Sequence, residues 1–307
     1  MNGKSENSRN NGKCVCHVCL HHCALKEGQY GRCGARKNEN GKIVCDIYGR
    51  ITALAVDPIE KKPLRHFYPG SRILSVGSYG CNLSCPFCQN HEISMAGRSH
   101  AGRGEAASES GEAPPESGEA PSDYEEISPE KVALLAEHYR EYGNIGVAFT
   151  YNEPLVGYEF VRDTARIVRE RGMKNVVVTN GSVTLPVLEE ILPYVDAMNI
   201  DLKGFSEEYY RKLGGDLETV KTFIVRAAQS CHVELTTLIV PGENDSEAEM
   251  EEEARWIASV GPDIVLHVTR FFPAYRMEDR NPTRKETVYR LRDVAGKYLK
   301  YVYTGNC

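Results

Sequence analysis

Three cysteines lie within eight residues of this chain, at a spacing that suits iron–sulfur chemistry. Cys81, Cys85 and Cys88 form the pattern C-x₃-C-x₂-C. A structural zinc or an ordinary electron-transfer cluster normally takes four protein ligands, whereas three thiolates on a four-iron cubane leave one iron free to bind another molecule. The open position of catalytic zinc has the same use, because a missing protein ligand makes room for chemistry.

The sequence before the cysteines predicts the element that positions them. Residues 73–76 (ILSV) are typical of a short buried strand, and Gly77 and Gly80 let the backbone turn off its end. The cysteines therefore follow the C-terminal end of a strand, which is the edge where active sites form in barrels and open α/β sheets. The alternative is three cysteines that are simply buried or that bind zinc.

Beyond residue 122 the sequence alternates between strand-like and helix-like segments. A helix is expected from Ser128, a typical N-cap, to Gly143. Further strands are expected at 145–150, 176–179, 197–202, 233–240, 264–269 and 301–303. Further helices are expected at 155–171, 185–192, 206–230, 246–259 and 284–299.

This alternation, with a repeat of ~25 to 30 residues, predicts parallel strands joined by right-handed crossovers. Counting from the strand before the cysteines gives six or seven β/α units, fewer than the eight of a closed barrel. We therefore predict an α/β fold, a partial and open (β/α)₆ barrel of the TIM type. The periodicity alone fits a flavodoxin-like sheet almost as well.

Polar residues follow three of the expected strands. Asn152 and Glu153 come after the first, Asn180 after the second, and Asp201 and Lys203 lie on one face of the third. Parallel strands bring these ends to one site. A carboxylate there suits an ammonium partner, and two opposite charges suit a zwitterionic ligand. The alternative for the last two residues is a structural ion pair.

A second group of cysteines precedes the barrel. Cys16, Cys19, Cys23 and Cys33 could supply four thiolates to one metal ion, zinc or a second iron–sulfur cluster. Such a small segment can hardly build a core alone, so a metal would supply the missing stability. The alternative is a set of reduced cysteines without metal. Possible substitute ligands are His17, His21 and His22.

The chain divides into segments of different composition. Residues 1–12 read as a disordered tail, 13–62 as the cysteine-rich segment, and 63–307 as the barrel. Within 13–62, residues 43–45 and 51–54 are expected to pair as a hairpin, and 57–63 (DPIEKKP) read as a charged surface loop. Residues 96–122 lack every large apolar residue, so a flexible acidic insertion is expected there, either a surface expansion or a lid.

Composition narrows the protein class. The chain has 307 residues, 41% hydrophobic and 26% charged, with no apolar run near the ~20 residues of a membrane span. Its net charge of −6 argues against nucleic acid as a partner. The number of cysteines is odd and most are closely spaced, which favours metal binding over disulfides. The sequence shows no secretion signal, so the cytoplasm is the expected location.

The cysteine pattern, with Phe87 before its last cysteine, resembles the signature of radical S-adenosylmethionine (SAM) enzymes. The resemblance implies a [4Fe-4S] cluster whose open iron chelates the amino and carboxylate groups of SAM, with Phe87 near the adenine. Asn152 and Glu153 are similar in position to a Gly-Gly-Glu motif that holds the SAM amino group. Asn180 would then face the ribose or carboxylate of SAM. The sequence 201–203 resembles a SAM-contacting motif of pyruvate formate-lyase activating enzymes.

Taken over nearly the whole chain, the sequence resembles the radical SAM enzyme of the AmmeMemoRadiSam system. The segments that carry this resemblance are 16–23, 57–64, the cysteine motif, 151–154, 199–204 and 271–275. It implies cleavage of SAM to a 5′-deoxyadenosyl radical that abstracts hydrogen from an unidentified substrate. It also implies a small reductant protein of the ferredoxin or flavodoxin type and association with the other components of that system.

Two other functions are compatible with the same residues. The chain could activate a glycyl radical protein, which requires a partner's glycine loop to enter the barrel. It could also be a non-catalytic iron–sulfur or zinc scaffold that uses both cysteine groups, in which case it would not bind SAM.

Overall fold

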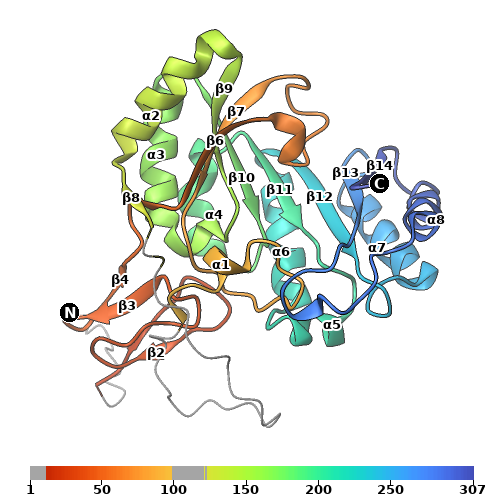
Figure 1. The fold of residues 1–307 in the computed structure, drawn as a ribbon, viewed down its shortest axis with the longest axis horizontal. Coiled ribbons are helices and arrows are strands. Elements are labelled where there is room, and N and C mark those ends of the chain that lie inside the picture. Colours follow the sequence, from red (N-terminus) through yellow and green to blue (C-terminus); the bar gives the residue numbers. More distant parts are fainter. Residues whose placement is uncertain (1–11, 99–120, 122) are drawn as a thin grey trace, which may run out of the picture.

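The computed structural model describes residues 12–98, 121 and 123–307. Most of the expected tail and most of the expected insertion lie outside these residues. An eight-stranded sheet forms the centre of the fold, and helices cover its outer face (Figure 1). The strands of this sheet are β6 (Ala53–Pro58), β7 (Arg72–Gly77), β9 (Asn144–Phe149), β10 (Lys174–Thr179), β11 (Ala197–Asp201), β12 (His232–Ile239), β13 (Val265–Arg270) and β14 (Val302–Gly305).

The sheet is parallel from β7 to β14, and β6 joins it antiparallel to β7. Spatial order follows chain order, β6-β7-β9-β10-β11-β12-β13-β14, as expected for successive β/α units. Among the described strands β6 and β14 are the sheet edges and do not pair with each other. The predicted partial (β/α) barrel is therefore confirmed.

The helices begin where the sequence provides caps. Ser128, Ser206, Asp216 and Ser246 each accept a hydrogen bond from a backbone N–H of the following helix. The helices are α1 (His91–Ser94), α2 (Pro129–His138), α3 (Tyr158–Glu170), α4 (Leu185–Ile191), α5 (Glu207–Lys212), α6 (Leu217–Ala228), α7 (Glu247–Val260) and α8 (Lys285–Ala295). None of the helices in the described ranges is long and apolar enough to cross a membrane.

The cysteine-rich segment contains short strands, and the hairpin expected within it is wrong. β4 (Lys42–Cys45) pairs with β3 (Arg36–Glu39) across Asn40 and Gly41, both at positive φ. An Asn-Gly pair favours such a two-residue turn. Residues 53–58 pair instead with β7 and cover an edge that would otherwise leave backbone groups unpaired. The sheet thus begins before the expected boundary at residue 63. The other short strands are β1 (Cys14–Val15), β2 (Ala24–Leu25), β5 (Arg50–Ile51) and β8 (Glu125–Glu126).

The loop between β6 and β7 fills the end of the barrel where the parallel strands begin. Ile59, Leu64 and Phe67 pack there against residues of β7, β9, β10 and β11. The carboxylate of Glu234, 0% exposed, accepts hydrogen bonds from the loop's backbone, at 2.9 Å from Arg65 N and 2.7 Å from His66 N. We call this end, with the loop of residues 59–71, the closed end of the barrel.

Candidate functional site

The loop of residues 78–90, here called the cysteine loop, follows the C-terminal end of β7. At Gly80 the backbone has φ of +83°, and an added Cβ would lie 2.6 Å from the carbonyl oxygen of Cys33. Only glycine fits both constraints. The next amide, that of Cys81, donates to the same carbonyl at 3.2 Å. The cysteine-rich segment therefore supports the first cysteine of the motif directly.

The three motif cysteines meet in one apolar cluster. Cys85 is buried in it, and Cys81 and Cys88 pack against it. The other buried members are Leu83, Phe87, Tyr209, Leu213, Val240, Phe271 and Met277. Burial raises the pKa of the Cys85 thiol to about 11, which the charge of Lys203 partly offsets. A thiolate at this position thus needs a cationic partner.

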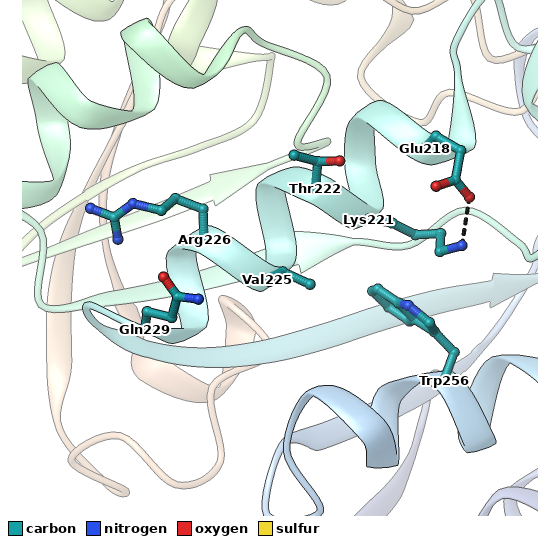
Figure 2. Close-up of a pocket in the computed structure, with 7 residues that line it drawn as sticks. All are labelled: Glu218, Lys221, Thr222, Val225, Arg226, Gln229 and Trp256. Carbon is teal, nitrogen blue, oxygen red and sulfur yellow. Dashed lines mark hydrogen bonds and ion pairs between the residues drawn. The ribbon is translucent and has the colours of Figure 1, made fainter.

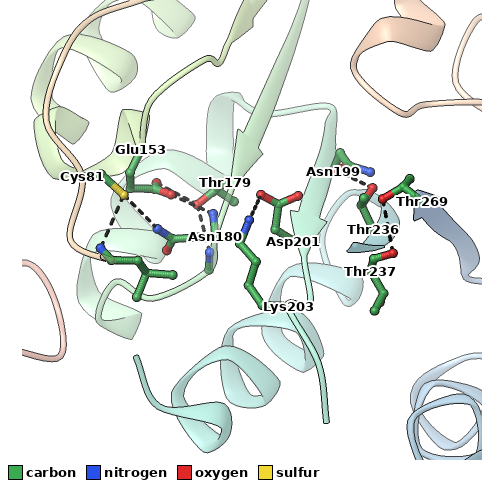
Figure 3. Close-up of polar contacts among 12 residues, drawn as sticks. Cys81, Glu153, Thr179, Asn180, Asn199, Asp201, Lys203, Thr236, Thr237 and Thr269 are labelled. Carbon is green, nitrogen blue, oxygen red and sulfur yellow. Dashed lines mark hydrogen bonds and ion pairs between the residues drawn. The ribbon is translucent and has the colours of Figure 1, made fainter. Parts of the chain in front are cut away.

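Two hydrogen-bond donors point at the sulfur of Cys81. The backbone N–H of Leu83 lies 3.4 Å from it and Nδ2 of Asn180 lies 3.6 Å from it. The same Asn180 amide donates to Oδ1 of Asn82 at 2.8 Å. Figure 3 shows Asn180 and Glu153 beside Cys81. The hydrogen bonds of Asn180 join the end of β10 to the cysteine loop.

Glu153 is buried at the tip of β9, with 2% of its surface exposed. Its Oε1 accepts hydrogen bonds from Leu155 N (3.0 Å) and from Thr179 Oγ1 (2.8 Å). Its Oε2 accepts one from Asn180 N (2.7 Å). Burial raises the pKa of Glu153 to about 7 although these donors oppose the shift. The carboxylate is oriented by β9 and β10 together.

Asn152 uses its side chain to hold the cysteine loop. Its Oδ1 accepts from Ser78 N at 3.1 Å, and its Nδ2 donates to the carbonyls of Tyr79 and Gly80, each at 3.0 Å. These bonds occupy both ends of the amide. In this structure the residue positions the turn that leads to Cys81.

Asp201 and Lys203 face each other at the end of β11, as Figure 3 shows, with Nζ of the lysine 2.7 Å from Oδ2 of the aspartate. Their side chains are 29% and 17% exposed, so a ligand can reach the pair. Burial opposes the charge of Lys203, but Asp201 and the thiolate of Cys85 raise its pKa. Lys203 is thus near enough to Cys85 for the charges of the two groups to interact.

The cysteines of the second group lie in one neighbourhood. Cys16, Cys19 and Cys33 are each 7% exposed. Burial raises the pKa of Cys19 to about 12, and the charges of the other three add to it. Within residues 12–98, 121 and 123–307, no three His, Cys, Asp or Glu side chains are arranged to hold one metal ion. The metal expected on Cys16, Cys19, Cys23 and Cys33 therefore stays a prediction.

Sequence reasoning missed a polar network on the β6 side of the site. Residues 57–63 are not a charged surface loop: Lys62 is 3% exposed and binds Oδ2 of Asp57 at 2.9 Å. The hydroxyl of Tyr151 donates to the same oxygen at 2.9 Å, and Ser75 Oγ donates at 3.0 Å. Tyr151 has φ of +75°, and its ring packs on Gly77, where a Cβ would lie 2.7 Å away. The sequence signal for Tyr151 is its position directly before the predicted site residue Asn152.

A surface hollow elsewhere on the molecule is separate from this site. It lies on the outer face, where α6 and α7 meet (Figure 2). Its lining is Glu218, Lys221, Thr222, Val225, Arg226, Gln229 and Trp256. Lys221 forms an ion pair with Glu218 and lies 5.6 Å from the centre of the Trp256 ring. No cysteine lines this hollow.

Comparisons with known proteins agree with this geometry. A family model described as the radical SAM superfamily matches residues 75–255. An uncharacterized protein of Methanocaldococcus jannaschii is 40% identical over 297 residues, which cover 96% of this chain and 81% of that protein. The pyruvate formate-lyase 1-activating enzyme of Escherichia coli strain K12 is 22% identical over 248 residues, 75% of this chain and 90% of that enzyme. A radical SAM methyltransferase from Sphaerobacter thermophilus shares the fold, with a TM-score of 0.55, 18% identity and coverage of 78% of this chain and 67% of that one.

Proposed function

Because this chain belongs to the radical SAM superfamily, whose members use a [4Fe-4S] cluster and SAM, we propose that it cleaves SAM at a cluster held by Cys81, Cys85 and Cys88. When bound, the reduced cluster supplies one electron that breaks the sulfonium bond of SAM, giving methionine and a 5′-deoxyadenosyl radical that abstracts hydrogen from a substrate. The observation that carries this proposal is the convergence of three thiols at the strand ends in one apolar cluster.

The donor set fits a cubane, because three cysteine thiols lie in one apolar cluster. The cysteines of a cubane each bind a different iron, so they need not converge on one point. Hydrogen bonds from Leu83 N and Asn180 Nδ2 to the Cys81 sulfur suit an anionic cluster, because donors to cluster sulfur stabilise its negative charge.

Charged groups beside the cysteines fit the polar ends of SAM. We propose that Asp201 and Lys203, which are partly exposed and of opposite charge, contact this zwitterion. Oε2 of Glu153 accepts one hydrogen bond, from Asn180 N, and so keeps capacity for the SAM ammonium. Asn152 and Asn180 act through the loop they hold, and Phe87 offers an apolar wall to the adenine.

The test is SAM cleavage by anaerobically reconstituted protein with dithionite. Wild type should release 5′-deoxyadenosine, and Cys85→Ala should not, because one corner of the cluster loses its ligand. Cys231→Ala is the matched control: this cysteine is also mostly buried, but it lies after α6, where its thiol contacts the carbonyl of Ala227. Equal product from wild type and Cys85→Ala would refute the assignment.

A second candidate is activation of a glycyl radical protein. It is favoured by the similarity to the pyruvate formate-lyase 1-activating enzyme and by the open sheet, whose edge strands β6 and β14 leave a side of the barrel unpaired among the described strands. Incubation with a candidate partner should then give a glycyl radical signal by electron paramagnetic resonance (EPR). If 5′-deoxyadenosine is formed but no glycyl radical signal appears, the substrate is not that partner protein. A non-catalytic scaffold would show no SAM binding by calorimetry.

We also infer a place for the protein that supplies the electron. Arg32 and Arg98 both bind Ser84 Oγ in the cysteine loop, at 3.2 and 2.9 Å, and His21 donates to the carbonyl of Asn82 at 2.7 Å. The two arginines are cationic and lie against the loop that carries Cys81 and Cys85, whereas burial lowers the pKa of His21 and favours its neutral form. An acidic ferredoxin- or flavodoxin-type protein fits this face by charge. The other components of the AmmeMemoRadiSam system are proposed partners on the sequence resemblance alone.

A metal in the cysteine-rich segment is a separate proposal. Four thiols in one neighbourhood, three of them buried, support zinc or a second iron–sulfur cluster there. Elemental analysis should find metal beyond the motif cluster in wild type and lose it in Cys19→Ser. Equal metal content in both proteins would contradict this proposal and leave the SAM chemistry untouched.

A further inference from the structure

Tyr209 places a hydroxyl in the apolar cluster of the motif cysteines without a hydrogen-bond partner. The residue is 4% exposed, and within the part of the chain that the structure describes its Oη has no partner. A buried hydroxyl left unpaired costs free energy, so native proteins rarely keep one without a use. A group outside the polypeptide is the natural acceptor.

The ring of Tyr209 packs against the backbone of Gly204, the residue after the Asp201–Lys203 motif. The backbone N–H of Tyr209 is bound by the N-cap Ser206, which starts α5. Gly204 makes room for the ring: an added Cβ would lie 2.8 Å from Cδ1 of Tyr209. The short helix and the glycine together direct this side chain into the cysteine cluster.

Among the motif cysteines, Cys85 is the one buried in the same apolar cluster as Tyr209. Leu83 and Phe87 are buried there with both. Burial raises the pKa of Tyr209, and the charge of Cys85 adds more to this shift than any other charged group. Lys203 is also near, but an ammonium is a donor and cannot accept the phenolic proton.

We propose that the Tyr209 hydroxyl donates a hydrogen bond to sulfur at the Cys85 corner of the bound cluster, and thereby raises its reduction potential. The inference rests on the proposed function, because it needs the cluster. Reduction adds negative charge to the cluster, and a donor to sulfur stabilises that charge. Cys81 already receives donors from Leu83 and Asn180. Tyr209 supplies the equivalent interaction at Cys85.

The experiment compares wild type, Tyr209→Phe and Tyr194→Phe. The first variant removes only the unpaired oxygen, and the second makes the same change at a partly buried tyrosine that packs against the main core. Each protein is reconstituted with iron and sulfide without oxygen. Its midpoint potential is measured by dithionite titration, with EPR of the reduced cluster as the readout, first without SAM and then with SAM.

Tyr209→Phe should make the potential more negative without SAM. We expect about a tenfold change in the reduction equilibrium, about 59 mV for one electron. Tyr194→Phe should match wild type. Without iron, Tyr209→Phe should melt at the same temperature as wild type or higher, because a buried unpaired group is gone.

An unchanged potential at equal iron content would overturn the inference, and so would a shift that appears only with SAM, since SAM would then be the acceptor. Failure of Tyr209→Phe to assemble the cluster supports the contact if the iron-free protein keeps its melting temperature, and overturns it if that temperature falls. Wild type that takes up no cluster would remove the proposed function itself, a result distinct from all of these.

Discussion

Replacing Glu234 by glutamine should destabilise the fold by about 3 kcal/mol at pH 7, judged from the pKa of this carboxyl. Glu234 is fully buried at the closed end of the barrel. Besides the loop amides of Arg65 and His66, it accepts hydrogen bonds from His232 Nε2 at 3.0 Å and His267 Nε2 at 2.6 Å. Glutamine keeps the shape but replaces one accepting oxygen by a donor and removes the charge.

The magnitude follows from linkage between protonation and folding. Burial disfavours the charged carboxylate, but the four donors outweigh it and lower the pKa of Glu234 from 4.5 to about 2. A carboxyl whose pKa is depressed in the folded state adds stability above its unfolded pKa and loses it as pH falls through the folded value. The shift of about 2.5 units at 1.36 kcal/mol per unit gives about 3 kcal/mol at pH 7, and about half of that near pH 3.

Urea denaturation of the metal-free protein at pH 7 and at pH 3 measures this difference. For a chain of 307 residues the loss at pH 7 corresponds to a melting temperature lower by about 5 °C. Glu252→Gln, at an exposed carboxyl of α7, is the control and should change neither quantity. A Glu234→Gln deficit that is absent at pH 7, or as large at pH 3 as at pH 7, would refute the reasoning.

Three further predictions concern other parts of the chain. Burial raises the pKa of Glu253 to about 8, and its carboxyl accepts one hydrogen bond, from Thr237, so the wild type should lose stability as pH rises from 4.5 to 8. In urea titrations, the free energy of unfolding of Glu253→Gln minus that of the wild type should therefore be larger at pH 9 than at pH 5. An equal difference at the two pH values would contradict this. Arg36→Lys breaks a bidentate ion pair with Glu159 (2.6 and 2.8 Å) and should lower stability by about 3 kcal/mol. Amide hydrogen exchange in residues 13–45 should then be faster than in the wild type, and unchanged exchange would count against this prediction. Arg32→Glu should slow reduction by an acidic carrier protein at low salt but not by dithionite, and equal slowing by both reductants would exclude a docking role.

The central elements could be predicted because their signals are local. The run ILSV before the cysteines, the alternation of strands and helices, and the position of Asp201 and Lys203 each depend on neighbours in sequence. The comparisons confirm the radical SAM superfamily, and the sheet confirms the partial barrel. Parallel strands then bring separate strand ends to one edge, which is why the candidate residues around Cys81 and Cys85 lie together.

The rest depended on contacts between distant residues. Lys62 looked exposed because its neighbours are charged, but in the interior it binds Asp57, which also accepts hydrogen bonds from Ser75 and Tyr151. The edge strand β6 was assigned to a hairpin because its partner β7 lies beyond two prolines. Nothing in the local sequence of α5 indicates that Tyr209 is buried beside the motif cysteines with its hydroxyl unpaired, since that placement depends on Gly204 and on the cysteine loop.

In the described chain, a side-chain hydrogen bond joins the two unpaired edges of the sheet at the closed end of the barrel. His66, in the loop that follows β6, binds the hydroxyl of Tyr303 on β14 at 2.8 Å, and Glu234 anchors the same loop to β12. Toward the cysteines the described strands share no ladder between these edges. Loops rather than strands bridge this end: the backbone N–H of Arg276, in the segment after β13, donates to the carbonyl of Pro86 in the cysteine loop at 3.0 Å. Closure of the barrel near the cysteines therefore depends on loop contacts and not on strand pairing.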